Sequence, residues 1–401
     1  MKFGIIKERK NPPDRRVVFS PSKLQEFKNQ FSTAVLKVEH SDIRVFSDEQ
    51  YRNSGIEVTE DISDCDVLFG VKEVPIAALI PNKKYFFFSH TIKKQPYNRA
   101  LLKAILDKNI ELYDHETITK VNGARLIGFG RYAGIVGAYN GFRAIGLKTE
   151  KFSLPKAETL DSQKELIDAL NKINLTNIKI LLTGNGKVAY GAKEMLDAMN
   201  IKNVSIEDYL SKDYDEAVYC FADVLDYNKR KDGKIINNRD FYTNPEAYEA
   251  NFMRFAKTTD FFIAGHFFGD GSPYLFTRTD AKHPDFNIKY VADVSCDIDG
   301  PVASTIRPST IAEPIYGYDA EAEMEVDYKD ENAIVVMAVD NLPCELPKDA
   351  SEGFGEMFLQ NVIPAFFNND KDGVLARAKM TANGKLTERF SYLQNYIDGK
   401  E

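Results

Sequence analysis

The sequence predicts an α/β protein with two domains, each built on a parallel sheet that is covered by helices. Its 401 residues exceed what a single hydrophobic core usually supports, so two domains are expected. Short apolar runs alternate with helix-length amphipathic stretches in two separate series along the chain. This alternation is typical of parallel sheets whose strands are joined by helical crossovers.

The first series predicts the sheet of an N-terminal domain. Its strand-like runs are 3–6, 34–38, 67–70, 85–88 and 110–113, with helical patterns from Ser22 and over 97–108. We assign residues 1–135 to this domain. The tail from Ser351 is polar and helical and has no further set of strands, so we expect 345–401 to fold back onto the same domain.

The second series predicts a doubly wound sheet in a domain spanning 136–344. Its expected strands are 178–183, 204–206, 217–221, 261–264, 289–293 and 333–338, and helices are expected over 187–200 and near 246–258. The stretch from Gly128 to Gly146 is rich in small residues. It predicts a helix that packs very closely against a neighbour and carries the chain into this domain.

A glycine-rich turn follows the first of these strands and opens a helix. Its sequence, Gly184-Asn185-Gly186-Lys187-Val188-Ala189, fits G-x-G-x-x-A. The first glycine permits the tight turn, the second lets a pyrophosphate approach the backbone, and Ala189 lets the helix pack on the strand. The helix N-terminus offers its N–H groups to the phosphates. The turn therefore predicts a Rossmann-like domain that binds a dinucleotide through Gly184, Gly186, Lys187, Val188 and Ala189.

The choice between NAD and NADP stays open at this point. Glu207 and Asp208 follow the second expected strand at about the distance at which an acid holds the adenosine ribose, which favours NAD. If that strand instead ends at Val204, Ser205 takes this position and NADP is permitted.

Composition and charge exclude several other classes. The formal net charge of −8 argues against a general nucleic-acid binder, which needs an excess of Lys and Arg. The N-terminal segment lacks the apolar core of a signal peptide, and no stretch has the 18 apolar residues of a membrane span, so we expect a cytoplasmic protein without a membrane partner. Four scattered cysteines and five unpaired histidines favour free thiols and no metal.

Several motifs, taken in order, resemble one family. They are Lys7-Glu8 with Arg15-Arg16-Val17 and Ser20-Pro21, Gly70 to Pro75, Phe88 to Lys93, Tyr113 to Glu116, and Arg125 to Gly134. The family comprises alanine dehydrogenase, the lysine-forming saccharopine dehydrogenase and the lysine–ketoglutarate reductase domain. Ala292 to Gly300, Ser309-Thr310-Ile311 and Val339 to Pro343 resemble the reductase branch. Because 401 residues leave no room for the second half of the fused enzymes, we expect a free-standing first half.

The resemblance implies an NAD(P)-dependent oxidoreductase that acts on a CH–NH bond. The main interpretation of the resemblance is a saccharopine dehydrogenase, which condenses L-lysine reversibly with 2-oxoglutarate. The alternatives are an alanine dehydrogenase-like reaction of pyruvate with ammonia and a catalytically silent dinucleotide-binding protein. The oligomeric state, monomer or homo-oligomer, and the physiological direction stay open.

The resemblance also implies site residues. Lys72 and His90 match the family's catalytic lysine and histidine. Arg15, Arg16, Lys93 and Arg125 would lower the pKa of the lysine and bind substrate carboxylates, while Glu73 and Glu116 moderate that positive field. Asp297 would lie beside the nicotinamide and the amine, and Asp293, Asn341 and Leu342 would contact the cofactor. Plainer interpretations remain: Arg15-Arg16 beside Asp14 forms a charged turn, and Asp293 caps a helix.

Overall fold

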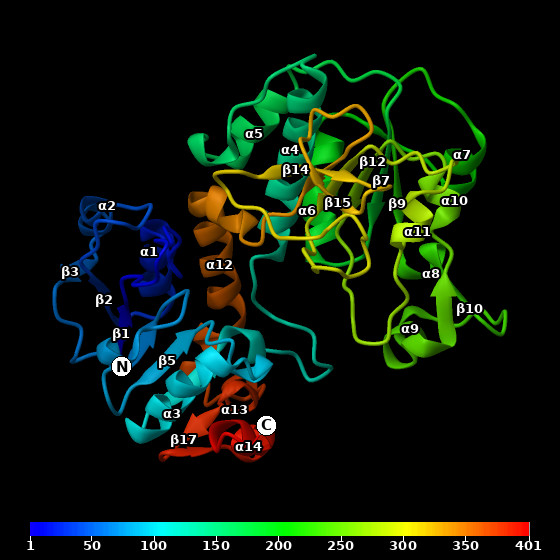
Figure 1. Ribbon diagram of the computed structural model, residues 1–401. Helices are drawn as coiled ribbons and strands as arrows, with labels where there is room; N and C mark the ends of the chain where they lie inside the picture. The colour runs from blue at the N-terminus through cyan, green and yellow to red at the C-terminus, as the bar shows by residue number, and fades with distance from the viewer. Residues whose placement is uncertain (401) are drawn as a thin grey trace. The chain divides into compact units, whose positions relative to one another are not determined.

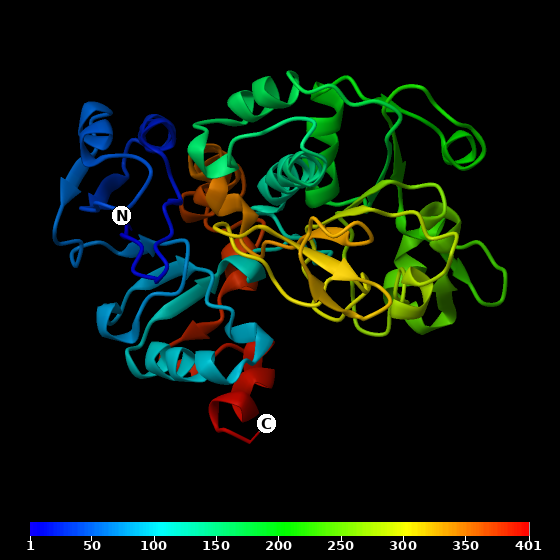
Figure 2. The same ribbon diagram turned by 45° about the horizontal axis from the view of Figure 1, so that its top comes forward.

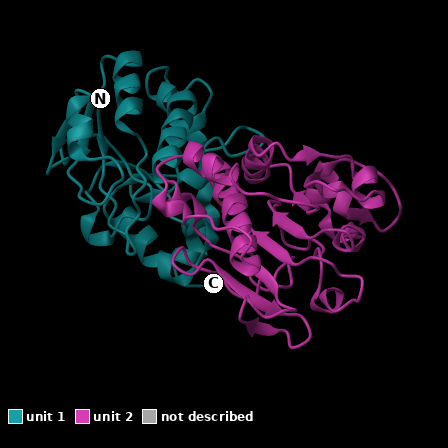
Figure 3. Cartoon of the chain, turned by 90° about the horizontal axis from the view of Figure 1, so that it is seen from above, with its two compact units in different colours: residues 1–129, 347–401 teal, residues 130–346 magenta. Residues whose placement is uncertain are grey.

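The computed structural model describes residues 1–400, which divide into two compact units (Figure 3). Unit 1 contains Met1–Phe129 and Pro347–Glu401, and unit 2 contains Gly130–Leu346. The sequence-based boundary at residue 135 is six residues later than the observed one. The reason is that residues 130–135 form the start of helix α4 (Gly130–Thr149), which belongs to unit 2 along its whole length.

Unit 1 is built on a six-stranded parallel sheet in the order β3-β2-β1-β4-β5-β6 (Figure 1). The strands are β1 Lys2–Ile5, β2 Val35–Glu39, β3 Glu57–Thr59, β4 Val67–Phe69, β5 Lys84–Phe87 and β6 Glu111–Asp114. Five of the six were expected from the sequence, and the edge strand β3 was not. The central strand β1 pairs with both neighbours, so that Phe3 lies between Leu36 and Val67.

The helices of unit 1 come from both ends of the chain. They are α1 Pro21–Gln30, α2 Asp48–Asn53, α3 Arg99–Asp107, α12 Pro347–Asn361, α13 Val374–Ala378 and α14 Gln394–Ile397. Helix α1 starts where Ser20 caps it, because the Ser20 hydroxyl accepts from the Lys23 N–H at 3.2 Å. A short hairpin, β17 (Thr381–Ala382) with β18 (Lys385–Leu386), joins the edge of the sheet through Thr381, whose hydroxyl accepts from the Leu112 N–H at 2.8 Å. The C-terminal tail therefore belongs to unit 1 (Figure 2).

Both faces of this sheet are buried. One face carries a phenylalanine cluster in which Phe69 lies 5.0 Å from Phe86 and 5.5 Å from Phe358 of α12, between ring centroids. The opposite face packs on α3 and the C-terminal segment through residues such as Leu102 and Tyr396, both fully buried. Parallel strands covered on both sides read as continuous apolar runs, which is why the sequence revealed them.

Unit 2 is built on an eight-stranded sheet in the order β15-β14-β16-β13-β12-β7-β9-β8. The strands are β7 Lys179–Thr183, β8 Lys202–Asn203, β9 Val218–Ala222, β12 Phe261–Ala264, β13 Tyr290–Asp293, β14 Ile315–Asp319, β15 Met324–Val326 and β16 Ile334–Met337. The six strands from β16 to β8 are parallel, and β14 runs antiparallel to both β15 and β16. The predicted doubly wound sheet is therefore present, with an antiparallel extension at one edge.

The remaining elements of unit 2 cover and connect this sheet. The helices are α4 Gly130–Thr149, α5 Gln163–Leu170, α6 Lys187–Ala198, α7 Ile206–Ser211, α8 Val224–Tyr227, α9 Asn238–Thr243, α10 Met253–Ala256 and α11 Arg278–Ala281, with a hairpin of β10 Asn228–Arg230 and β11 Tyr248–Ala250. No helix in the described part of the chain has the length and apolar character that crossing a membrane requires.

Two local predictions for unit 2 were wrong. The strand expected over 204–206 is not formed, and the observed strand β8 ends at Asn203. The Ser205 hydroxyl accepts from the Asp208 N–H at 3.1 Å and so caps helix α7 instead. The expected helix 246–258 is broken into the strand β11 and the single turn α10. The strand forms because Arg230 and Tyr248 pair across the hairpin.

The predicted close packing of the glycine-rich helix is confirmed. Helices α4 and α6 lie side by side (Figure 1), and a Cβ added at Gly134 would lie 1.9 Å from the Val188 carbonyl oxygen. In the opposite direction, a Cβ at Gly191 would lie 2.0 Å from the Arg131 carbonyl oxygen. The backbones of the two helices therefore touch, which fixes the position of the first turn of α6.

Candidate functional site

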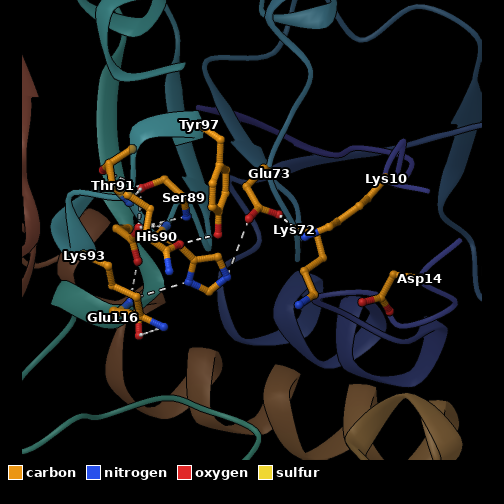
Figure 4. A network of polar contacts seen from close by, with 12 residues as sticks. Lys10, Asp14, Lys72, Glu73, Ser89, His90, Thr91, Lys93, Tyr97 and Glu116 are labelled. Carbon is orange, nitrogen blue, oxygen red and sulfur yellow. Dashed lines mark hydrogen bonds and ion pairs between the residues drawn. The ribbon is translucent and has the colours of Figure 1, made fainter. Parts of the chain in front are cut away.

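Charged side chains gather at the carboxyl ends of four neighbouring strands in unit 1 (Figure 4). Lys72 and Glu73 follow β4, His90 follows β5 and Glu116 follows β6, while the segment after β1 contributes Asp14. Parallel strands end at one edge of a sheet, so residues far apart in the sequence meet there. The structure thus brings together the predicted catalytic pair and the predicted acids.

His90 lies between two carboxylates. Its Nδ1 is 3.3 Å from Glu116 Oε2, and its Nε2 is 3.7 Å from Glu73 Oε1. Lys10 donates from Nζ to Glu73 Oε2 at 3.0 Å, which holds that carboxylate in place. Two carboxylates beside one imidazole orient its two nitrogens, and an imidazole placed in this way can accept or donate a proton.

Glu116 is the anionic centre of the cluster. Its side chain is 5% exposed and accepts from Arg125 Nη2 at 2.8 Å, with Lys93 Nζ at 3.9 Å. Burial by itself raises the pKa of Glu116, but the hydrogen bond to His90 and the charges of Arg125 and Lys93 outweigh burial and lower it to about 2. Glu116 is therefore ionised at neutral pH, and it links His90 to the two cations.

Asp114 shapes the turn that carries His90. Its buried carboxylate accepts from the backbone N–H groups of Ser89 at 2.8 Å, His90 at 3.1 Å and Glu116 at 2.7 Å, and also from the Ser89 hydroxyl. His90 has a left-handed φ of 54°, a conformation that such local hydrogen bonds can maintain. Sequence reasoning missed the role of Asp114, although an acid that ends a strand beside a Ser-His turn is a signal that could have revealed it.

Glu8 holds the loop that carries Lys72. Its two carboxylate oxygens accept from the Val71 N–H at 2.6 Å and the Lys72 N–H at 2.9 Å. Burial raises the pKa of Glu8 to about 7, against the effect of these two hydrogen bonds. The Lys72 side chain extends towards Asp14 (Figure 4), and its charge is one of those that keep Asp14 ionised.

The predicted arginines occupy different environments. Arg16 is buried and binds Asp14 through Nε at 3.0 Å and Nη2 at 2.6 Å, with its guanidinium 4.2 Å from the centroid of the Phe129 ring. Burial raises the pKa of Asp14, but the charge and hydrogen bonds of Arg16 reverse this and lower it. Arg15 is exposed and, within the described residues, makes no side-chain hydrogen bond or ion pair. Arg125 is half exposed and joins the cluster through Glu116.

The second candidate site is the glycine-rich turn of unit 2. Gly184 has a φ of +108°, and a Cβ there would lie 2.5 Å from the Gly265 carbonyl oxygen, so the position requires glycine. Gly186 is the N-cap of the 12-residue helix α6, which has no side-chain cap, and a Cβ added there meets nothing within 4 Å. Ala189 is fully buried, Val188 half-buried and Lys187 exposed. An open backbone at an uncapped helix N-terminus fits a pyrophosphate.

The strand order changes which acid lies beside this turn. Glu207 and Asp208 lie on α7, which follows the edge strand β8, and β8 is separated from β7 by β9. Asp223 directly follows β9, the neighbour of β7, and its Oδ2 accepts from the Asn185 side chain of the turn at 3.1 Å. The sequence did not point to Asp223, because a sequence shows the succession of strands and not their order in the sheet.

The other predicted cofactor residues follow β13 and β16. The buried Asp293 accepts from Ser295 N at 3.1 Å, Cys296 N at 3.1 Å and the Thr305 hydroxyl at 2.7 Å, so its carboxylate holds the loop after β13 together. Asp297 is half-buried, and burial followed by the charge of Asp293 raises its pKa. Leu342 is buried against α4 at Gly137, and Asn341 is half-buried.

Two α/β units, one with a dinucleotide-type turn and the other with an acid–base cluster, define a two-domain dehydrogenase fold. Comparison with known proteins agrees: residues 4–136 match the family model described as alanine dehydrogenase/PNT, N-terminal domain. A solved L-alanine dehydrogenase matches the whole of this chain and the whole of its own, with a TM-score of 0.65 and 15% identity. The predicted fold class and the resemblance are both confirmed.

Proteins of similar sequence carry more specific names than the family model and the solved structure. Alpha-aminoadipic semialdehyde synthase of Rattus norvegicus is 27% identical over 100% of this chain and 48% of its own length. A saccharopine dehydrogenase [NAD(+), L-lysine-forming] of Yarrowia lipolytica is 24% identical over 81% of this chain and 82% of its own. The chain spans about half the length of the first of these relatives.

Proposed function

We propose that this chain is an NAD(P)-dependent oxidoreductase that reversibly joins L-lysine to 2-oxoglutarate to form saccharopine. The observation that carries the proposal is the cluster in which His90 lies between Glu73 and Glu116, one strand away from Lys72. Its similarity to a saccharopine dehydrogenase and to an alpha-aminoadipic semialdehyde synthase supports the choice of substrates.

The proposed reaction consumes L-lysine, 2-oxoglutarate, NAD(P)H and one proton, and it yields saccharopine, NAD(P)⁺ and water. The lysine ε-amine loses a proton and forms a C–N bond to the keto carbon. The resulting carbinolamine gains a proton on its hydroxyl and loses water. A bound nicotinamide dinucleotide supplies the hydride that reduces the C=N bond.

Lys72 and His90 are the groups of this chain that move the protons. Lys72 takes the proton from the substrate amine, and the protonated His90 gives one to the departing hydroxyl. Glu73 and Glu116 orient the two nitrogens of the imidazole. Glu8 and Asp114 act as positioning residues, because they bind the backbone of the two catalytic turns.

The cations of the cluster bind the substrate carboxylates. 2-Oxoglutarate is a dianion, and an acidic protein must gather its positive charge locally to attract it. The side chains of Arg125 and Lys93 are both about half exposed, and Arg15 lies exposed on the loop after β1. Arg16 is buried and paired with Asp14.

The dinucleotide binds at the turn after β7. Gly186 and the first N–H groups of α6 hold the pyrophosphate, with Lys187 and Val188 in the same turn. On the nicotinamide side, Asp297, Asn341 and Leu342 follow strands β13 and β16, while Asp293 supports their loop.

A substrate panel tests the proposal directly. Purified protein is mixed with NADH or NADPH, and oxidation of the reduced cofactor is followed with lysine plus 2-oxoglutarate, with pyruvate plus ammonium, and with 2-oxoglutarate plus ammonium. We expect turnover with the first pair only, and saccharopine identified by mass. Turnover with pyruvate and ammonium alone would replace the proposal by an alanine dehydrogenase activity, which the N-terminal family match favours. Cofactor binding without any turnover would indicate a silent dinucleotide-binding protein.

A further inference from the structure

We propose that His115 is a positioning residue, which fixes the loop of Lys72 by donating a hydrogen bond to the backbone of that loop. The inference rests on the proposed function, because it takes Lys72 to be the group that accepts the proton of the substrate amine. It deepens that function by assigning a role to a buried histidine that is distinct from the proton-transferring His90.

His115 reaches the lysine loop across the end of one strand. Gly70, Phe88 and His115 are each the first residue after a strand, namely β4, β5 and β6, which are neighbours in that order. Parallel strands end at one edge of a sheet, so a side chain that follows β6 can lie close to the backbone that follows β4. The His115 Nε2 donates to the Gly70 carbonyl oxygen at 2.8 Å.

This hydrogen bond belongs to a continuous set along the lysine loop. The Val71 and Lys72 N–H groups donate to the carboxylate of Glu8. The Val71 carbonyl accepts from the Phe88 N–H at 3.0 Å. Together with the imidazole on the Gly70 carbonyl, four consecutive backbone groups are bound, from the Gly70 C=O to the Lys72 N–H. The Lys72 side chain leaves the backbone directly after these groups, so its starting point is fixed.

The surroundings of His115 keep its imidazole neutral. The side chain is fully buried and lies edge-on to the rings of Phe88, Phe354 and Phe358, at 4.8, 5.2 and 5.3 Å between ring centroids. Burial lowers the pKa of His115 to about 3. Because the Gly70 oxygen can only accept, the single ring proton is on Nε2. His115 therefore exchanges no proton with a substrate at neutral pH, and it acts through its hydrogen bond.

The second ring nitrogen shows that packing alone does not explain a histidine here. Nδ1 is buried and has no hydrogen-bond partner among the residues that the structure describes. A buried polar atom without a partner destabilises the native state, because water binds it in the unfolded chain. An apolar side chain would fill the space without this penalty. What the imidazole adds is one N–H group directed at the lysine loop, and such local departures from the most stable choice are typical of functional sites.

Two variants of the full-length protein separate the hydrogen bond from the packing. His115→Gln and His115→Met both replace the ring by an unbranched chain of similar length, but only glutamine keeps an N–H donor. Methionine adapts to buried apolar sites, so this variant should fold. His283→Met, at an exposed residue of the other unit, is the matched control.

Two readouts are measured for each protein. The first is kcat and KM with lysine, 2-oxoglutarate and the reduced dinucleotide. The second is hydrogen exchange, followed by mass spectrometry, of the peptide that contains the Val71 and Lys72 amides. This second readout reports the loop itself and needs no turnover.

We expect His115→Met to lower kcat about 10- to 100-fold, since a misplacement of about 1 Å at a reacting group can have an effect of this size. The KM for 2-oxoglutarate should change less than about twofold, because its proposed cationic ligands lie outside this loop. The loop peptide should exchange about tenfold faster. His115→Gln should return both kcat and exchange to within about threefold of the wild type, and the control should match the wild type.

Equal losses of kcat in His115→Gln and His115→Met would overturn the inference, because the ring and not its donor would then be responsible. An unchanged kcat and unchanged exchange in His115→Met would overturn it as well. If the wild type shows no turnover with lysine and 2-oxoglutarate, the proposed function fails, and the exchange rates then decide by themselves whether His115 holds the loop.

Discussion

The two candidate sites occupy the same place in two similar sheets and are built in opposite ways. In unit 1 the carboxyl ends of the strands carry long charged side chains that bind one another, such as Glu116 with His90 and Arg125. In unit 2 the corresponding edge carries a turn whose residues Gly184 and Gly186 have no side chains. The fold thus supplies a common location, and the chemistry depends on whether side chains or bare backbone are placed there.

The two units also differ in the order of their strands. Counted along the chain, the parallel strands of unit 1 follow the order 3-2-1-4-5-6, whereas those of unit 2 follow 2-3-1-4-5-6, because β9 and not β8 lies beside β7. The exchange moves Asp223 next to the glycine turn and leaves Asp208 outside. A single change in topology therefore changes which acid lies beside the turn, without any change in the local motif.

The largest expected effect comes from Lys72. Replacing it by Met should lower kcat with lysine and 2-oxoglutarate by about 10³-fold, since general acid–base catalysis contributes about 10²–10⁴. NADH binding, measured by fluorescence, should stay within about twofold, because the glycine turn belongs to the other unit. Lys103→Met, at an exposed residue of α3, is the matched control. Loss of NADH binding in Lys72→Met would contradict the assignment of proton transfer to unit 1 and of cofactor binding to unit 2.

Glu8 should make unit 1 sensitive to pH. Its pKa is raised to about 7, so between pH 4.5 and 7 the native state binds more protons than the unfolded chain, and stability falls as pH rises through this window. The shift corresponds to at most about 3 kcal/mol.

Urea unfolding of the wild type and Glu8→Gln at pH 5 and pH 8 checks this expectation. Glu8→Gln loses one of the two hydrogen bonds to backbone N–H groups, and its side-chain amide does not titrate between these pH values. The stability difference between wild type and variant should therefore be largest at pH 5 and shrink at pH 8. A constant difference would show that burial of Glu8 has no electrostatic cost.

The glycines of the turn should separate binding from stability. A side chain at Gly186 enters open space, so Gly186→Val should fold normally and bind NADH about 100-fold more weakly, roughly 3 kcal/mol. Gly184→Ala should instead lower the Tm, because both its φ and the Gly265 carbonyl oppose a Cβ. Equal melting temperatures for the two variants would contradict this assignment.

The smallest effect is expected at Glu116. Glu116→Gln keeps the shape but removes the negative charge beside His90, so kcat should fall about tenfold, near 1.4 kcal/mol. The melting temperature should change little, so that the lower kcat reports the reaction and not the fold. A Tm that falls together with kcat would indicate a merely structural role.

Much of the fold could be predicted from the sequence because buried parallel strands are continuous apolar runs, as in Val67–Phe69 and Ile334–Met337. The failures have local causes. The sequence around Ser205 predicts a strand, yet the Ser205 hydroxyl caps helix α7. Whether such a serine extends a strand or caps a helix depends on the backbone geometry. The strand Tyr248–Ala250 needs its partner Asn228–Arg230, whose position the sequence does not reveal.

The candidate site was predictable where residues carry their own chemistry. Lys72, His90 and the glycine turn could be named from motifs, and the structure brings Lys72 and His90 to one sheet edge. Asp114 and Glu8 could not, because they act by accepting hydrogen bonds from backbone N–H groups. The position of Asp223 beside the turn follows from strand order, which a linear pattern does not contain.

The contact between α4 and α6 has a consequence for how variants of this protein will be interpreted. Gly134 and Gly191 each face a backbone carbonyl at a distance that excludes even a methyl group. Neither glycine takes part in the proposed chemistry, yet both should tolerate no substitution in a mutational scan. Such a scan would rank them with Lys72, and only a measurement of the amount of folded protein would tell a lost reaction from a lost fold.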